Sequence, residues 1–231
     1  MELNSSFYQL PSLPTVHDML SKVPEGFGFF VKAHRNLTHV RQKAGDILPR
    51  FQDMVTVYQE AHKLGGVLFQ FPPEFECSAV HEDYLRGLVD SLHGIRAVVE
   101  FRHTRWNNAR TMALLRQLGA ASCIVDMPSV RDAPSEWPAV TADVAYVRFH
   151  GQNRDHWART SSGDERYDYD YSDEELRGWV PVIAGLSTQV KDTYVYFNNH
   201  YHGNGAKNAK TLEGLLGSFQ QQSGVQRLPI G

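Results

Sequence analysis

Charged side chains stand at the end of the apolar run Ile95–Phe101. Glu100 and Arg102 are two residues apart, and His103 follows them directly. In a β-strand this spacing puts Glu100 and Arg102 on one face, with Val98 below them. Such a pair is often only a structural ion pair, so a functional reading depends on which other groups accompany it.

A second run, Val144–Phe149, repeats this arrangement. Tyr146, Arg148 and His150 fall on one face of the expected strand. Polar residues also stand at the ends of the other apolar runs of the chain: Asn4, Lys32, Gln70, Asp126, Asn198 and Asn199. If the carboxyl ends of all these strands meet, they form one polar surface that could bind a ligand.

The balance of charge among these residues favours an anionic ligand. Three cations (Lys32, Arg102 and Arg148) stand against two carboxylates (Glu100 and Asp126), and arginine binds phosphate or carboxylate groups bidentately. We therefore expect a small anionic or phosphorylated substrate, such as a sugar phosphate. The residues expected to bind it are Asn4, Lys32, Gln70, Arg102, His103, Tyr146, Arg148, Asn198 and Asn199.

The same surface offers groups for acid–base catalysis. We expect Glu100 or Asp126 to act as the base and His150 as the acid, because a carboxylate among cations stays ionised and a histidine titrates near neutrality. The sequence shows no nucleophile elbow and no phosphate-binding loop motif. Hydrolase, lyase and isomerase activities all stay open, as does a non-catalytic ligand-binding role.

A metal site is the alternative reading of these groups. Glu100, Asp126, His103, His150 and His200 could together hold a divalent metal in a phosphoesterase or a nuclease-like hydrolase. None of the local spacings typical of metal ligands is present, and the excess of cations argues against a metal cage. The prediction therefore includes no metal ligand and no cofactor.

Two loops add to the expected site. Asn198–Ala206 contains two glycines and precedes a helical stretch, Ala206–Leu216, so that backbone N–H groups at the helix start could bind an anion. Gly151–Tyr171 is long, polar and rich in aromatic residues, including His156, Trp157, Arg159, Tyr167 and Tyr169. We interpret it as a lid or a substrate platform, with disorder as the alternative.

The elements that must position these residues are strands alternating with helices. The apolar runs are Glu2–Phe7, Phe27–Lys32, Gly66–Phe71, Ile95–Phe101, Ala121–Val125, Val144–Phe149 and Thr193–Phe197. Alternation of this kind predicts parallel strands, in either a closed barrel or an open doubly wound sheet. Polar residues at nearly every strand end favour a TIM-type barrel. We expect one barrel domain over residues 1–219 and a flexible tail over residues 220–231.

Composition bounds the function further. The 231 residues carry a formal net charge of −3 and include two cysteines, which is typical of a cytoplasmic protein without a disulfide framework. No apolar stretch is long enough to span a membrane. The charge disfavours a nucleic-acid partner, although a local contact stays open. The oligomeric state is not readable.

Taken in order, these segments resemble the YecE-like family, also called domain of unknown function seventy-two. The resemblance covers almost the whole chain. It is carried by Glu2-Leu-Asn-Ser-Ser-Phe-Tyr8, Phe29-Phe-Val-Lys32 with Thr38-His39, Gln70-Phe-Pro72, Glu100-Phe-Arg-His103 with Trp106, Asp126-Met-Pro128, Tyr146-Val-Arg-Phe-His-Gly151, Tyr171-Ser-Asp-Glu-Glu-Leu176 and Tyr196-Phe-Asn-Asn-His200, followed by Gly203 and Asn208-Ala209.

The resemblance implies a TIM-type barrel without an established activity. It also implies an earlier start, because family members begin with a strand close to Ile-Gly-Thr-Ser-Gly-Trp and a helix. We therefore expect seven of the eight barrel strands in this chain, with the first strand–helix unit missing. Either Met1 is an internal residue of a longer reading frame, which we prefer, or the chain is a natural truncation.

Overall fold

Strands alternate with helices along most of the described chain. The computed structural model describes residues 1–128, 139–158 and 165–223, and within them the structure has seven strands. The chain divides into two compact units, residues 1–102 with 118–120 and residues 103–117 with 121–231. The predicted fold class, a TIM-type α/β fold of parallel strands and helices, is confirmed.

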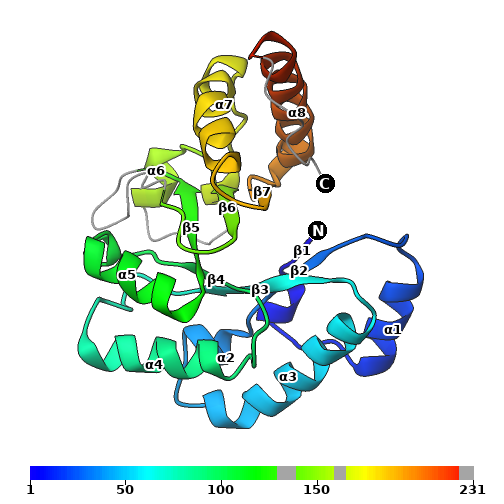
Figure 1. Ribbon diagram of the computed structural model, residues 1–231, viewed down its shortest axis with the longest axis vertical. Helices are drawn as coiled ribbons and strands as arrows, with labels where there is room; N and C mark the ends of the chain where they lie inside the picture. Colours follow the sequence, from blue (N-terminus) through cyan, green and yellow to red (C-terminus); the bar gives the residue numbers. More distant parts are fainter. Residues whose placement is uncertain (129–138, 159–164, 224–231) are drawn as a thin grey trace. The chain divides into compact units, whose positions relative to one another are not determined.

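The first unit contains four parallel strands. Its elements are β1 (Glu2–Leu3), η1 (Ser5–Phe7), α1 (Leu13–Ser21), β2 (Phe29–Lys32), α2 (Arg35–Thr38), α3 (Ala44–Glu60), β3 (Leu64–Gln70), α4 (Ala79–Asp90) and β4 (Ala97–Glu100). β1 pairs with β2, β2 with β3, and β3 with β4. In Figure 1, helices α2, α3 and α4 lie on one side of β2, β3 and β4.

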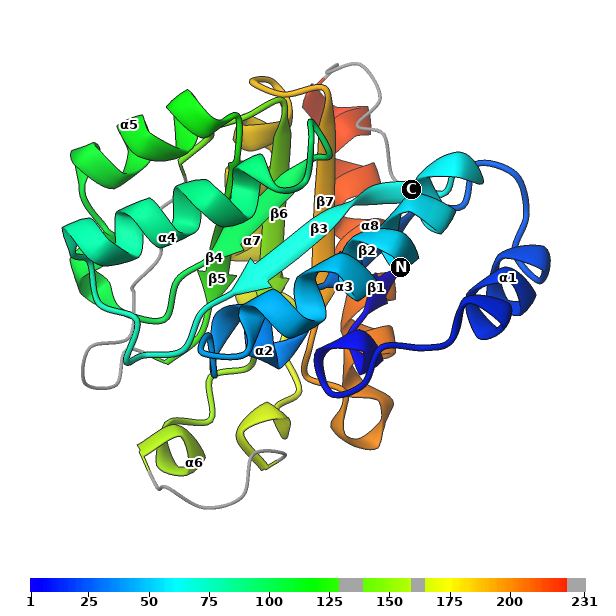
Figure 2. The same cartoon turned by 90° about the horizontal axis from the view of Figure 1, so that it is seen from below.

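Packing against α3 determines which face of these strands is apolar. The buried residues of α3 recur at helical spacing, and one of them, Tyr58, has its ring 5.2 Å from that of Phe29 in β2. Phe29 and Val31 therefore face the helices, whereas Phe30 and Lys32 lie on the opposite face of the strand. Figure 2 shows α3 lying over this sheet. The alternation leaves Lys32 at the carboxyl end of β2, on the face away from the helices.

Two glycines in β3 make room for the ring of Phe30. Phe30 is fully buried and pairs in register with Gly66. A Cβ atom on Gly66 would lie 2.7 Å from Cε1 of Phe30 and 2.8 Å from the carbonyl oxygen of Arg96. Such approaches are closer than real Cβ contacts, so a side chain here requires the strands to move.

We expect Gly66→Ala to lower the free energy of unfolding by about 1–3 kcal/mol, the usual cost of overfilling a packed core. Urea denaturation of the purified variant measures this. Gly87→Ala is the matched control, because Gly87 lies in helix α4 and a Cβ there meets no atom within 4 Å. The control should be neutral or slightly stabilising. Equal stabilities of the two variants would contradict this reading of the glycine.

The second unit contains three parallel strands. Its elements are η2 (Thr104–Trp106), α5 (Ala109–Leu118), β5 (Ala121–Asp126), β6 (Val144–Phe149), α6 (Arg154–Ala158), η3 (Glu165–Tyr167), α7 (Asp173–Ser187), β7 (Asp192–Phe197), η4 (Tyr201–Gly203) and α8 (Asn204–Ser223). β5 pairs with β6, and β6 with β7. A capping box begins α7: the side chain of Ser172 accepts from the backbone N–H of Glu175, and the side chain of Glu175 accepts from the backbone N–H of Ser172.

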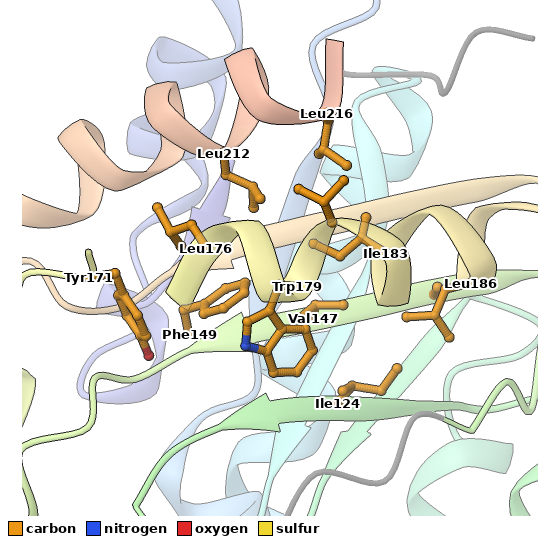
Figure 3. Close-up of a cluster of buried hydrophobic side chains, with 12 residues drawn as sticks. Ile124, Val147, Phe149, Tyr171, Leu176, Trp179, Ile183, Leu186, Leu212 and Leu216 are labelled. Carbon is orange, nitrogen blue, oxygen red and sulfur yellow. The ribbon is translucent and has the colours of Figure 1, made fainter. Parts of the chain in front are cut away.

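Helix α7 packs between the strands and helix α8. Figure 3 shows Trp179 pointing toward Val147, while Leu176 points toward Leu212 of α8. The ring of Trp179 lies 5.0 Å from that of Phe149, at an angle of 72°. Val147 and Phe149 of β6 therefore face α7, and Arg148 between them faces the other way.

Two predictions from the sequence fall partly outside the described residues. The loop expected over Gly151–Tyr171 contains the short helices α6 and η3, but residues 159–164 are not described. Helix α8 continues to Ser223, four residues into the expected tail, and residues 224–231 are not described. Within the described residues, no helix is both long and apolar enough to cross a bilayer.

Candidate functional site

Positive charge is concentrated at the carboxyl ends of the strands of the first unit. Lys32 ends β2, Arg35 begins α2, Arg41 follows that helix, and Arg102 stands two residues beyond the end of β4. These four side chains are called the cationic group below. Burial lowers the pKa of His39, and the charges of the cationic group lower it further, to about 4. His39 is therefore a neutral imidazole at neutral pH.

The ring of Phe7, in η1, contacts both a cation and this histidine. Nζ of Lys32 lies 4.5 Å from the centroid of the Phe7 ring, and the His39 ring lies 4.9 Å from it at an angle of 80°. The hydroxyl of Ser6 donates to the carbonyl oxygen of Lys32 at 2.7 Å, which ties η1 to the end of β2. These contacts hold η1, the end of β2 and the loop after α2 together, although the three segments are distant in sequence.

Arg41 is held by the loop that carries His39. Its guanidinium donates to the carbonyl oxygens of Thr38 and His39, at 3.0 and 3.3 Å, and lies 5.2 Å above the ring of Phe75. The hydroxyl of Thr38 is also 2.9 Å from Nδ1 of His39. The charge of Arg41 and the imidazole are thus positioned by the same short segment.

The structure brings Glu100 and Arg102 together, as their spacing indicated. Nε of Arg102 lies 2.5 Å from Oε1 of Glu100, whose side chain is fully buried. Gln70 pairs with Glu100 in register, and its amide donates to the carbonyl oxygen of Phe71 at 2.8 Å. Asn4 donates to the carboxylate of Glu2 at 2.8 Å.

In the second unit, Asp126 faces the helices. It pairs in register with Phe149, which packs on α7. Its carboxylate accepts a hydrogen bond from the amide of Gln152 and another from the hydroxyl of Tyr171. The Tyr171 ring is buried in one apolar cluster with Phe149 and Trp179. Burial raises the pKa of Tyr171, and the charge of Asp126 raises it further, so that the phenol stays protonated and donates to Asp126.

Tyr146, Arg148 and His150 lie toward the opposite face from Asp126. Arg148 and Tyr146 are buried, and the Tyr146 ring lies 5.1 Å from that of Tyr196 in β7. Nδ1 of His150 is 3.3 Å from Nδ2 of Asn198, which follows β7. The structure therefore brings His150 and Asn198 together, and the alternation along β5 and β6 places Asp126 and Arg148 on opposite faces of the strands.

The expected platform supplies aromatic rings near His150. The rings of Trp157 and Tyr167 lie 6.4 and 5.9 Å from the His150 ring, and the His200 ring lies 5.7 Å from that of Tyr167. Gly151 begins the segment with φ of +88°, and a Cβ there would lie 2.6 Å from Cβ of Tyr169. Glycine is required at this turn because Tyr169 packs directly against it.

Asn199, at the start of the last loop, forms hydrogen bonds within the protein. Its amide donates to the carbonyl oxygen of Tyr169 at 2.8 Å and to Oδ1 of Asn208 at 2.7 Å. Helix α8 begins at Asn204, and a Cβ on Gly205 would lie 3.3 Å from the carbonyl oxygen of Phe197. The glycine-containing loop therefore packs closely on the end of β7.

Comparison with known proteins identifies the family. A family model described as "Protein of unknown function DUF72" matches residues 1–229. The chain belongs to the DUF72 family. This confirms the resemblance seen in the sequence.

Relatives of this DUF72 protein include one curated protein and two proteins of known structure. UPF0759 protein YunF of Bacillus subtilis is 31% identical over 232 residues, covering 94% of this chain and 82% of YunF. A DUF72 structure from Thermotoga maritima is 37% identical with a TM-score of 0.85, covering 94% of this chain and 84% of that one. A DUF72 structure from Enterococcus faecalis has a TM-score of 0.87 at 23% identity, with the same coverage, and supports the fold alone.

His103 and His200 of this DUF72 protein, both candidate metal ligands in the sequence, lie in different surroundings. His103 caps η2, where its Nδ1 accepts from the backbone N–H of Arg105 at 3.1 Å. His200 is exposed, with Nδ1 3.0 Å from the carbonyl oxygen of Asn198. In the part of the chain that the structure describes, no three His, Cys, Asp or Glu side chains are grouped so as to hold a metal ion.

Sequence reasoning missed His39 and Phe7 as members of the polar site in this DUF72 protein. Both lie in segments that carry the family resemblance, but neither was counted among the expected binding residues. One signal was available: Phe7 ends the expected strand Glu2–Phe7, and His39 lies in the segment after Phe27–Lys32, at the end of the strands where a TIM-type fold presents its functional groups. Their mutual contact, between residues 32 positions apart, was not readable from spacing.

Proposed function

We propose that the protein is an enzyme that binds a small anionic or phosphorylated substrate at the carboxyl ends of its strands and acts on it by acid–base catalysis. One observation carries this proposal: the cationic group gathers around His39, whose pKa is lowered to about 4 by burial and then by these four charges. Keeping like charges together costs free energy unless an anion offsets them. In TIM-type folds this end of the strands is where substrates bind.

Each unit supplies a candidate for proton transfer. In the first unit, Glu100 is the proposed base, because burial disfavours its charged form while Arg102 stabilises it. Asp126 accepts hydrogen bonds from Tyr171 and Gln152, and such bonds favour the carboxylate and weaken it as a base. In the second unit, His150 keeps its proposed role as an acid.

Anion binding tests the proposal. We expect the protein to bind sulfate, measured by isothermal titration calorimetry, and Lys32→Gln to weaken this binding by about tenfold or slightly more, because a hydrogen bond to a charged group contributes about 1.5 kcal/mol. Lys22→Gln is the matched control: Lys22 is exposed and pairs with Asp18 in α1, away from the strand ends. The proposal fails if the wild-type protein binds no sulfate, or if both variants bind it equally.

A further inference from the structure

We propose that His39 is a ligand-binding member of this anion site, and that the protein takes up a proton on His39 when a doubly charged oxyanion binds there. The inference rests on the proposed function, because it presupposes anion binding at the cationic group. Beyond that function, the inference names His39 as the residue that links anion binding to proton uptake, and it specifies that the ligand carries two negative charges. A phosphate monoester dianion belongs to this class, and sulfate serves as its non-titrating probe.

The geometry puts the imidazole among the groups that would bind the anion. Lys32 and His39 contact the same ring, that of Phe7, at 4.5 and 4.9 Å. Arg41 donates to the carbonyl oxygen of His39 itself. The charges of Lys32 and Arg41 both act on the imidazole, so an anion that contacts these two side chains would lie near it.

The hydrogen bonds of His39 permit either protonation state. Nδ1 lies 2.9 Å from the hydroxyl of Thr38, and a hydroxyl can either donate to a bare ring nitrogen or accept from a protonated one. Among the described residues, Nε2 of His39 forms no hydrogen bond with another side chain or the backbone. Nε2 is therefore the atom that would carry a proton to the ligand.

The charges around His39 come from four separate places in the first unit. Lys32 acts from β2, Arg35 from α2, Arg41 from the loop after α2, and Arg102 from beyond β4, where Glu100 is its partner. η1 contributes the ring of Phe7, which is uncharged. His34, which caps α2, has a pKa lowered by burial and by Arg35 and Arg50, so it adds no positive charge at neutral pH.

An anion among these cations reverses the sign of the local charge. It would favour the imidazolium that the empty site disfavours, so the pKa of His39 would rise on binding. Binding and protonation are then linked, and each strengthens the other by the same factor. Affinity should rise as the pH falls from the pKa of His39 in the complex toward its lower value of about 4 in the free protein, by up to about tenfold per pH unit.

Calorimetry with sulfate at several pH values, each in two buffers of different ionisation enthalpy, measures both the affinity and the protons taken up. We expect the wild-type protein to bind more tightly as the pH falls from 7 to 5, with uptake of up to one proton. His39→Gln should bind sulfate with an affinity that is nearly independent of pH and with no proton uptake. His17→Gln, an exposed histidine of α1, is the matched control and should behave as the wild-type protein does.

The outcomes separate the inference from its premise. Absence of sulfate binding at every pH overturns the proposed function, and the inference with it. Binding without proton uptake, or uptake that persists in His39→Gln, overturns the inference alone. Should that variant not fold, the His39 resonance of the wild-type protein decides the matter by NMR: its titration midpoint should move upward when sulfate is added, and an unmoved midpoint contradicts the inference.

Discussion

Arg102→Met is expected to lower the free energy of unfolding by about 3–5 kcal/mol at pH 7. Glu100 is fully buried, and its carboxylate lies 2.5 Å from Nε of Arg102. Removing the guanidinium takes this ion pair away from a buried negative charge, which costs far more than the pair itself contributes. Urea denaturation at pH 7 measures the loss.

Two further variants test the cause of this loss. Lys22→Met breaks the ion pair with Asp18, in which both side chains are more than half exposed, and should cost about 1 kcal/mol at most. Glu100→Leu combined with Arg102→Met removes both charges and should recover much of the stability. If the single and double variants at this site are equally unstable, lost packing is the cause and the electrostatic explanation is wrong.

The second large effect is expected for Asn208→Leu, which should lower the free energy of unfolding by about 3–5 kcal/mol. Oδ1 of Asn208 accepts from Nδ2 of Asn199 at 2.7 Å and from the backbone N–H of Tyr171 at 3.3 Å. Its own amide donates to the carbonyl oxygen of Tyr171 and to Asp170, both at 3.0 Å. Leucine fills a similar volume but leaves these groups unsatisfied, at about 1–3 kcal/mol for each buried one.

Thermal or urea unfolding followed by circular dichroism measures this effect. Lys210→Leu, at an exposed position of the same helix, is the matched control and should change the free energy of unfolding by less than about 0.5 kcal/mol. A loss near 1 kcal/mol for Asn208→Leu would mean that water replaces the missing bonds. The buried network would then not be what holds the segment before α7 against α8.

The sequence was sufficient to predict the α/β class, because strand and helix periodicities differ and short apolar runs such as Val144–Phe149 leave little choice. The pairing of Glu100 with Arg102 followed from the two-residue repeat of a strand. All of these depend on residues close together in the chain.

Contacts between distant segments could not be predicted in the same way. Asp126 ends a strand, as Arg148 nearly does, and both were expected to share one surface. The register places Asp126 beside Phe149, on the side of β6 that packs on α7, and this side is known only once Trp179 is seen to pack there. The environment of His39 likewise depends on charges up to 63 positions away in the chain, at Arg102.

The close fit of Phe30 over β3 has a consequence for how this sheet can change. A Cβ on Gly65 would lie 2.7 and 2.9 Å from atoms of the Phe30 ring, and the nearest backbone atom, the carbonyl oxygen of Phe29, would be at 3.3 Å, which is tight but could be relieved by a shift of a few tenths of an ångström. The obstacle at position 65 is therefore the ring and not the main chain. A smaller residue at position 30 would open a void that a side chain at position 65 could fill. Substitutions at these two positions should therefore occur together, because either one alone would destabilise the sheet.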